Sequence, residues 1–324
     1  MLAAELPIRL GRSPLQLRAA PTRVEPLPGG SWVMREDAAG GDIGGSKLRK
    51  LEWCFADSPA GDVITLGPAG GLHLVSAAVV GRALGVRVHA VAWPQPWLPG
   101  AEANLQALHA HAENVWASRS RAHALARLAR LYATVRVQSG ERPAVWGPGA
   151  SDAAGTLGWA HAAMELAERA AAGEFRLPAR VVLAQGSGGT AAGLQLGFAL
   201  AGAPTEVHAV DVTGFGARLV RAQSARAHRV LEEAGVEVPR LPVFRCIAEP
   251  SPYGVPTAAG GSAAAWAAAH GFTVDAVYSA KALAWALSGG GAFLFVATAN
   301  GRPMAPLLRS ALPELPARLA ALWC

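Results

Sequence analysis

The 324-residue sequence is poor in cysteine, in charged residues and in aromatic residues. Its three cysteines, Cys54, Cys246 and Cys324, form no Cys-x-x-Cys pair and show no metal-ligand spacing. A sparse and odd set of this kind excludes a disulfide framework and favours a reducing compartment. No metal site is therefore expected.

A membrane-spanning segment is also missing, because every apolar stretch of sufficient length contains glycine, proline or a charged residue. Residues 1–10 lack a basic region followed by an apolar core, so a signal peptide is not expected. The sequence predicts a soluble, cytoplasmic protein without a membrane partner.

Charged residues make up only 16% of the chain, with a formal net charge of +6. The densest basic group, Arg119, Arg121, Arg127 and Arg130, resembles a solvated helix face more than a nucleic-acid footprint, which needs clustering on one face. No nucleic-acid partner is expected, although a basic protein attracts anionic small molecules. The hydrophobic content of 52% permits a large core, and the length suggests about two domains.

Short apolar runs alternate with helical patterns along most of the chain. The predicted strands cover residues 63–66, 86–93, 180–184, 206–212 and 292–297; the predicted helices cover 75–84, 158–172 and 191–200, with a further helix whose buried face is marked by Leu125, Leu128 and Tyr132. Continuous apolar strands separated by helices predict an α/β fold, with mostly parallel sheets covered by helices on both faces.

A glycine-rich loop lies between the strand at 180–184 and the helix at 191–200. It contains Gly186, Ser187, Gly188, Gly189 and Thr190. Such a loop turns backbone N–H groups into one concavity at a helix N-terminus, which favours an anion such as phosphate. Two cofactors fit this pattern. One is a dinucleotide, because Gly186, Gly188 and Ala191 match G-x-G-x-x-A and Asp211 follows the next strand. The other is pyridoxal 5′-phosphate (PLP).

A lysine motif distinguishes these two cofactors. Gly44-Gly-Ser-Lys47-Leu-Arg-Lys50-Leu-Glu52 resembles G-G-N-K-x-R-K-L-E of the D-cysteine desulfhydrase and 1-aminocyclopropane-1-carboxylate (ACC) deaminase family of PLP-dependent enzymes. The resemblance continues in the family's order through segments 32–37, 149–158, 185–194, 253–257 and 275–281. This order favours PLP over a nicotinamide cofactor, whose fingerprint usually opens the first βαβ unit.

The resemblance implies a tryptophan-synthase-β-like PLP fold (fold type II) with two domains, each a mostly parallel twisted sheet with helices on both faces. The large PLP-binding domain would comprise residues 1–50 and 161–324, and the small domain residues 51–160. The family also suggests a homodimer.

The same resemblance implies roles for individual residues. Lys47 would hold PLP as a Schiff base and act as a base, and Lys50 would lie near the phosphate held by Gly186–Thr190. Tyr253 and Tyr278 would be catalytic residues on the substrate side. Ser279, or Thr298, would lie at the pyridine nitrogen, where ACC deaminases carry Glu after the second tyrosine.

The sequence departs from the family where the substrate would bind. The family's I-Q-S-N-H turn is replaced by residues 69–73, so that Gly71 stands for the serine that binds the substrate carboxylate and Leu72 for an asparagine near PLP. Gly70 and Gly71 could still offer N–H groups to a carboxylate. His73 is retained, and either a catalytic or a packing role fits it.

These features predict a divergent PLP-dependent lyase or deaminase acting on a small amino acid. Its simplest reaction is β-elimination to a keto acid and ammonia, with a substrate other than that of D-cysteine desulfhydrase and a place in specialised biosynthesis. The alternatives are a PLP-dependent β-replacement synthase, a PLP-binding homologue without turnover and, less favoured, an NAD-binding oxidoreductase.

Overall fold

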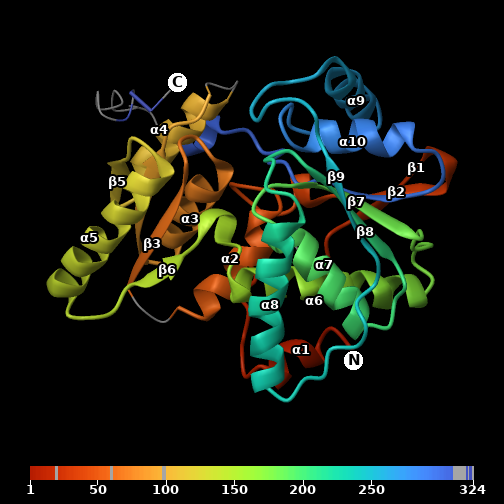
Figure 1. The fold of residues 1–324 in the computed structure, drawn as a ribbon, viewed down its shortest axis with the longest axis horizontal. Coiled ribbons are helices and arrows are strands. Elements are labelled where there is room, and N and C mark those ends of the chain that lie inside the picture. The colour runs from red at the N-terminus through yellow and green to blue at the C-terminus, as the bar shows by residue number, and fades with distance from the viewer. Residues whose placement is uncertain (19–20, 59–60, 97–99, 309–318, 320, 323–324) are drawn as a thin grey trace. The chain divides into compact units, whose positions relative to one another are not determined.

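The computed structural model describes residues 1–18, 21–58, 61–96, 100–308, 319 and 321–322 (Figure 1). The chain divides into two compact units. The first comprises Met1–Asp57 and Ser151–Arg302, and the second comprises Ser58–Ala150 and Pro303–Cys324. The domain boundaries expected at residues 50 and 160 stay a prediction, because compactness alone does not show which segments fold independently.

The first unit contains a six-stranded sheet in the order β1-β2-β10-β7-β8-β9. Its strands are β1 (Val24–Leu27), β2 (Ser31–Met34), β7 (Arg180–Gln185), β8 (Glu206–Asp211), β9 (Phe244–Ala248) and β10 (Leu294–Val296). Edge strand β1 pairs antiparallel with β2, and the remaining strands are parallel. The predicted strands at 180–184, 206–212 and 292–297 therefore lie next to one another in one sheet.

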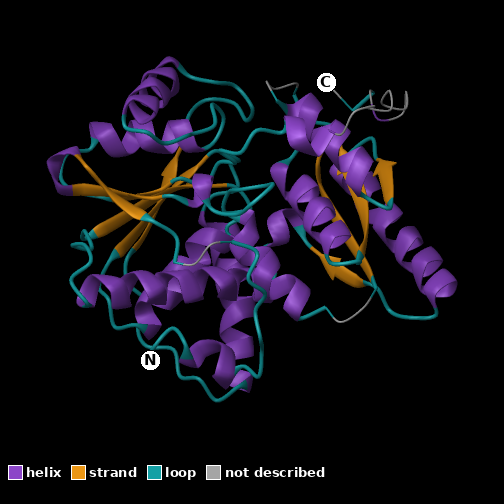
Figure 2. Cartoon of the chain, turned by 180° about the vertical axis from the view of Figure 1, so that it is seen from behind, coloured by secondary structure: helices purple, strands orange, loops and turns teal. Residues whose placement is uncertain are grey.

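Helices cover both faces of this sheet (Figures 1 and 2). On one face lie α6 (Ala153–Ala171) and α7 (Gly189–Leu200), and on the other α9 (Ala258–Ala269) and α10 (Ser279–Ser288). The unit also contains α1 (Glu5–Arg9), α2 (Lys47–Ala56), α8 (Ala217–Glu233) and the short 3₁₀ turns η1 (Pro28–Gly30) and η2 (Glu36–Ala38). Val181 and Leu183 point into the core formed with α6 and α7, whereas Val182 points into the core formed with α9 and α10. Because both faces are buried, residues 181–184 of β7 are all apolar, as is usual for parallel strands.

The second unit contains a wholly parallel sheet in the order β5-β4-β3-β6. Its strands are β3 (Asp62–Pro68), β4 (Arg87–Trp93), β5 (Asn114–Ala117) and β6 (Ala144–Trp146); its helices are α3 (Leu72–Ala83), α4 (Ala101–His111), α5 (Arg121–Ser139), η3 (Pro148–Ala150) and η4 (Ala305–Leu308). The predicted fold class, an α/β chain with two mostly parallel sheets, is confirmed.

The predicted buried face of α5 needs one correction. Leu128 and Tyr132 pack against the sheet as expected, but Leu125 is 61% exposed. The face toward β3 and β4 is completed by Leu131 and Val135 instead. The helix therefore presents a face rotated from the predicted one, since its small and apolar residues offer more than one face at helical spacing.

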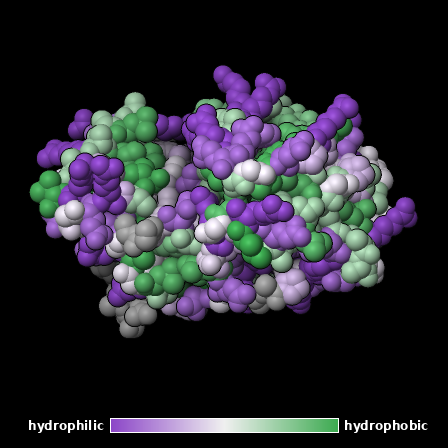
Figure 3. Space-filling view, turned by 90° about the horizontal axis from the view of Figure 1, so that it is seen from below, coloured by the Kyte–Doolittle hydropathy of each residue, from purple (hydrophilic) through white to green (hydrophobic). Residues whose placement is uncertain are grey.

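The described residues contain no helix that is long and apolar enough to cross a membrane. Cys54 and Cys246 are free thiols, and Cys324 lies outside the described residues. Figure 3 shows one face of the molecule, on which hydrophilic and hydrophobic side chains are interspersed.

Candidate active site

Lys47 is the first residue of α2 and follows a glycine loop that the segment 298–300 holds in place. The Ser46 N–H donates to the Thr298 carbonyl oxygen (3.2 Å), and the Gly44 N–H donates to Asn300 Oδ1 (2.9 Å). Gly45 has a φ of +90°, and a Cβ there would lie 2.9 Å from the Ala299 carbonyl oxygen. The loop thus fixes the point at which α2 begins, and with it the position of Lys47.

The Lys47 amine lies in a half-buried environment that disfavours its charge. Burial lowers the pKa of Lys47 to about 8, against a smaller opposing effect of the Asp275 carboxylate. The positive end of α2 acts in the same direction as burial, because a cation at a helix N-terminus is unfavourable. At pH 7 roughly a tenth of this amine is therefore uncharged, against well under about a thousandth for a lysine at its ordinary pKa, and the uncharged form can act as a nucleophile or base.

Lys50, one helical turn later, is linked to the glycine loop through two hydroxyl groups. Its Nζ donates to Ser151 Oγ (2.7 Å), and Ser151 Oγ lies 2.6 Å from Ser187 Oγ. Burial and the neighbouring Lys47 hold the pKa of Lys50 well below its usual range, although Cys54 and Asp152 partly offset them. An anion bound at the loop would favour the charged form of this amine.

The loop Gly186–Thr190 joins β7 to α7 and leaves the first-turn N–H groups of α7 available for an anion. Gly188 has a φ of +85°, and a Cβ there would lie 2.8 Å from the backbone at Leu219 and Val220. A Cβ on Gly189 would lie 2.6 Å from Ser151 Oγ. Only glycines fit at these two positions without displacing their neighbours.

Close helix contacts connect the start of α2 with the start of α7. Gly158 of α6 lies against the backbone at Arg49 of α2, where a side chain would overlap the Arg49 carbonyl oxygen. Gly193 and Gly197 of α7 lie equally close to the backbone of α6. Because both helices pack on α6 at backbone contact, the spacing between Lys47 and the loop at 186–190 is set by main-chain geometry.

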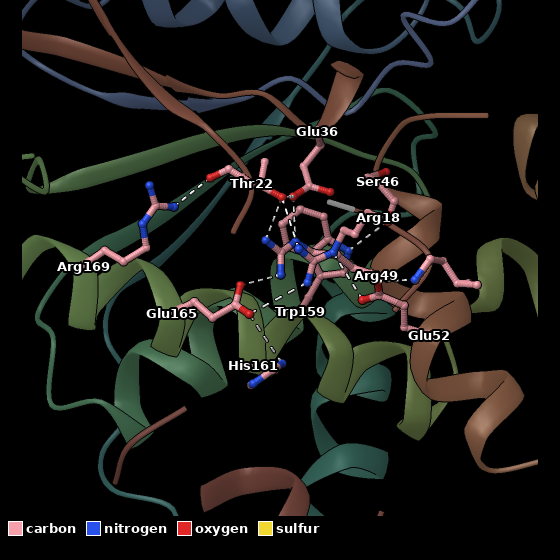
Figure 4. Close-up of polar contacts among 11 residues, drawn as sticks. Arg18, Thr22, Glu36, Ser46, Arg49, Glu52, Trp159, His161, Glu165 and Arg169 are labelled. Atoms are coloured by element: carbon pink, nitrogen blue, oxygen red, sulfur yellow. Dashed lines mark hydrogen bonds and ion pairs between the residues drawn. The ribbon is translucent and has the colours of Figure 1, made fainter. Parts of the chain in front are cut away.

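A buried ionic network lies behind α2 (Figure 4). Arg49 Nε donates to Glu36 Oε1 (2.6 Å), and Arg49 Nη1 donates to Glu165 Oε2 (2.8 Å). Trp159 Nε1 donates to the carbonyl oxygen of Ser46, directly before Lys47 (3.2 Å). The network ties α2 to η2 and α6. It was not among the predicted site features, although Arg49 lies inside the lysine motif and Glu36 lies in the family-like segment 32–37.

Tyr253 and Tyr278 form a pair beside the loop. Their hydroxyl oxygens are 2.5 Å apart, and their rings meet edge to face with centroids separated by 5.9 Å. A Cβ on Gly186 would lie 3.3 Å from the Tyr278 ring, so this tyrosine lies against the loop. The structure therefore brings both predicted tyrosines together with the glycine loop.

Ser279 is completely buried and bound to Asp275 at the start of α10. Its hydroxyl donates to Asp275 Oδ2 (2.5 Å) and accepts the Asp275 N–H (2.8 Å). Since the hydroxyl hydrogen is committed to a carboxylate, Ser279 can serve a further partner only as an acceptor. Thr298 lies in the loop contact with Ser46 described above.

The turn predicted to bind the substrate belongs to the second unit. Gly70 has a φ of +69°, and a Cβ there would lie 2.5 Å from the Ala101 carbonyl oxygen. Gly71 precedes α3, whose first residue is the half-buried Leu72. His73 is buried, and its Nε2 lies 2.7 Å from Thr65 Oγ1. This contact joins the start of α3 to β3 and favours the packing role for His73.

The dinucleotide interpretation is not supported at Asp211. Its carboxylate accepts hydrogen bonds from the Thr213 N–H (3.0 Å), the Thr213 hydroxyl (2.7 Å) and the Gly216 N–H (2.5 Å). These bonds use both oxygens to shape the loop after β8. A ribose hydroxyl would have to compete with them.

The groups of the first unit fit PLP in their chemistry. They combine an amine of lowered pKa at Lys47, a second amine at Lys50 joined to Ser187 through Ser151, and a glycine cradle that added Cβ atoms would fill. PLP carries an aldehyde and a phosphate, which match an amine and an anion cradle respectively. Ser151 was missing from the predicted site, although it lies in the segment 149–158 that resembles the family.

Comparison with known proteins agrees with this fit. A family model described as "Pyridoxal-phosphate dependent enzyme" matches residues 9–295. Nocardicin C-9′ epimerase of Nocardia uniformis subsp. tsuyamanensis is 33% identical over 323 residues, which cover 92% of this chain and 96% of that protein. D-cysteine desulfhydrase of Klebsiella pneumoniae (strain 342) is 31% identical over 296 residues, which cover 85% and 88%.

The fold has a counterpart among solved structures. The crystal structure of an ACC deaminase homologue matches with a TM-score of 0.77 at 24% identity and covers 94% of this chain and 99% of that one. The predicted resemblance and the predicted cofactor, PLP, are confirmed. On the family model and the extent of these similarities, the chain belongs to the pyridoxal-phosphate-dependent enzymes.

Proposed function

We propose that this protein is a PLP-dependent lyase or deaminase that acts on a small amino acid by β-elimination, leaving a keto acid and ammonia. The observation that carries the proposal is the tyrosine hydroxyl pair beside the glycine loop, in the same unit as the amine of Lys47. The similarity to D-cysteine desulfhydrase supports the reaction class. Gly71 and Leu72 support a substrate other than that of the desulfhydrase.

Lys47 would hold the cofactor, while Lys50, Ser187 and the loop at Gly188–Thr190 would hold its phosphate. When bound, PLP supplies an electron sink for negative charge that develops on the substrate carbon. Ser279 would accept a hydrogen bond from the cofactor ring, because its own hydrogen is donated to Asp275.

Lys47 would take the proton from the amine-bearing carbon, because its lowered pKa leaves the amine free to accept one. The tyrosine pair would hand a proton to the departing β-substituent. With the two oxygens 2.5 Å apart, Tyr253 and Tyr278 can act as one unit, in which one hydroxyl donates outward while the other stabilises it.

Epimerisation at the amine-bearing carbon is a second candidate, which the similarity to nocardicin C-9′ epimerase favours. This reaction needs one group to remove a proton and another to return it on the opposite side. Lys47 and the tyrosine pair provide two such groups. Elimination and epimerisation share the first proton transfer and differ in the second step, which is loss of the β-substituent or return of a proton.

The cofactor assignment is tested by the visible spectrum of the purified protein, followed by borohydride reduction and peptide mapping. We expect a visible chromophore and one reduced adduct, on Lys47. Lys47→Ala should abolish the adduct, whereas Lys281→Met serves as the lysine control that retains it. An adduct on Lys50 or Lys281 in the wild type would overturn the assignment.

The reaction is tested by incubating D- and L-amino acids with β-leaving groups in deuterated water, following them by NMR and determining the configuration of the recovered amino acid by chiral chromatography. Keto acid with ammonia supports elimination, whereas deuterated substrate of inverted configuration supports epimerisation. Product formation only with an added nucleophile would indicate β-replacement. A bound chromophore with no change in any substrate would indicate the non-catalytic alternative.

We further propose that the protein works as a cytoplasmic homodimer in specialised biosynthesis. The family resemblance supports the dimer, and the sparse cysteines support the compartment. Light scattering of the purified protein at several concentrations tests the dimer directly.

A further inference from the structure

Lysine is scarce in this protein, and none of its lysines is fully exposed. The sequence contains three lysines and 26 arginines. Two of the lysines are Lys47 and Lys50 of the candidate site, and the third is Lys281, which is 2% exposed. A position that keeps lysine in such a chain is one where the compact ammonium, with three donors on a flexible stem, is not replaced by the planar guanidinium.

Lys281 is held in a specific set of polar contacts. Its Nζ donates to Ser251 Oγ at 2.5 Å, and the Ser251 N–H donates to Glu249 Oε1 at 3.1 Å. Burial lowers the pKa of Lys281, against the opposing charges of Glu249 and Asp275. Because an isolated buried ammonium is strongly unfavourable, these partners account for its presence in the interior.

Lys281 and its partner Ser251 lie close in sequence to the two tyrosines of the pair. Tyr278 is the residue directly before α10, and Lys281 lies three residues later in the first turn of that helix. Ser251 precedes Tyr253 by two residues in the loop between β9 and α9. Two bonds therefore join α10 to this loop side by side: Lys281 to Ser251, and Tyr278 to Tyr253.

We propose that Lys281 is a positioning residue that anchors Ser251 and thereby holds the Tyr253 hydroxyl against Tyr278. A loop residue without such an anchor samples many positions, whereas proton transfer requires the hydroxyl within hydrogen-bond reach. The catalytic meaning of the anchor rests on the proposed function, because it assumes that the tyrosine pair moves a proton. The anchor itself is a property of the fold.

Tyrosine NMR tests the anchor without any turnover. The chain has three tyrosines, so protein labelled with 13C at Cζ of tyrosine gives three signals, assigned with Tyr132→Phe, Tyr253→Phe and Tyr278→Phe. We expect Lys281→Met to shift the signals of Tyr253 and Tyr278 while leaving that of Tyr132 unchanged. Ser251→Ala should produce the same pattern and provides the test if Lys281→Met does not fold.

Arg180→Met is the matched control, because Arg180 donates to the Gly290 and Gly291 carbonyl oxygens just beyond the far end of α10. It should leave the signals of the pair in place. In Lys281→Arg the signals of Tyr253 and Tyr278 should also differ from those of the wild type, since a guanidinium is larger than an ammonium and planar. Unchanged Tyr253 and Tyr278 signals in both Lys281→Met and Ser251→Ala, or equal shifts in Arg180→Met, would overturn the proposal.

A double-mutant cycle tests the catalytic consequence. Tyr253→Phe should lower kcat by about 10²-fold, and Lys281→Met should lower it by about tenfold through misplacement of the hydroxyl. If Lys281 acts through Tyr253, the double variant should match Tyr253→Phe alone. Multiplied effects would overturn the positioning role. A wild type without any turnover would instead count against the proposed function, and the NMR result would still decide the anchor.

Discussion

Lys47 differs from a surface lysine through its immediate surroundings. It starts a helix, it is half-buried, and the carboxylate that favours its charged form is Asp275. The Asp275 oxygens also accept hydrogen bonds from the Ser279 hydroxyl and from the backbone N–H groups of residues 277–279. Asp275 therefore has its charge partly neutralised by α10 before it acts on Lys47. Burial therefore outweighs the effect of Asp275, and the pKa of Lys47 stays lowered.

The pKa of Lys47 leads to a prediction about pH. In the cofactor-free protein, labelling of Lys47 by an amine-selective reagent should increase with pH, reach half its maximum near pH 8 and level off above about pH 9, because the unprotonated amine reacts and the pKa is about 8. Asp275→Asn should move the curve to lower pH, since it removes the charge that favours the ammonium form. Labelling is quantified by peptide mapping, and a curve that still rises through pH 10 would contradict the prediction.

Glycines of the loop give a second prediction at this scale. Gly188→Ala should destabilise the protein more than Gly202→Ala, although both glycines have positive φ, of +85° and +67°. The control position has nothing within 4 Å of an added Cβ, so it carries only the conformational cost of about 1–2 kcal/mol. Gly188→Ala adds an overlap with the backbone at Leu219 and Val220. Urea unfolding measures both, and equal losses would show that the overlap is relieved at no cost.

At the scale of elements, α2 is held mainly by the contacts of its Arg49 with η2 and α6 and by Trp159 of α6. Arg49 reaches Glu36 and Glu165 while Trp159 holds the Ser46 carbonyl oxygen, so the residue before Lys47 and the residue two after it are both fixed (Figure 4). Although burial opposes it, the two carboxylates raise the pKa of Arg49 and keep it charged. The helix that carries both site lysines is thereby oriented by residues that face away from them.

Removing the central cation should be costly. Arg49→Met leaves Glu36 and Glu165 without their main counter-charge and should lower the free energy of unfolding by about 3–5 kcal/mol. The control is Arg245→Met, which breaks the surface pair with Glu206, in which Arg245 is 59% exposed, and should cost less than about 1 kcal/mol. Thermal or urea unfolding compares them. A loss for Arg49→Met as small as the control would mean that the network contributes little net stability.

At the scale of the whole molecule, the residues predicted to hold the cofactor belong to one unit. Lys47, Lys50 and the loop at 186–190 all lie in the first unit, whereas the turn at 70–73 belongs to the second. Cofactor binding should therefore stabilise the first unit directly. The second unit should be stabilised only if the cofactor or the substrate contacts the turn at 70–73.

Addition of PLP at about 100 times its Kd should stabilise the cofactor-free protein by about 2.7 kcal/mol. Hydrogen exchange should locate the protection in α2 and α7, with α5 of the second unit as the internal reference. Lys50→Met should weaken the effect, because it removes a charge that serves the phosphate. Protection that rises equally in α5 and α7 would contradict a site centred on the first unit.

The sequence was sufficient for much of this molecule because the relevant patterns are local. The apolar run at 181–184, the glycine-rich stretch at 186–189 and the following small residues predict a strand, a loop and a helix, and the structure contains the strand as β7 and the helix as α7. Hydrophobic period and glycine spacing act within a few residues, so they are visible in the chain itself. The face of α5 was predicted wrongly at Leu125, since several faces of that helix are apolar enough to be buried.

The lysine motif, the loop at 186–190 and the further segments that resemble the family in its order together predicted a PLP enzyme with Lys47 as the proposed anchor, and the family comparison agrees on the cofactor. Only the tertiary structure linked Lys50 to Ser151, which are 101 residues apart, and Lys281 to Ser251, and only it placed Arg49 between two carboxylates from distant segments. Partners of this kind are chosen by how helices pack on the sheets. Packing depends on the whole chain, which local residue patterns do not encode.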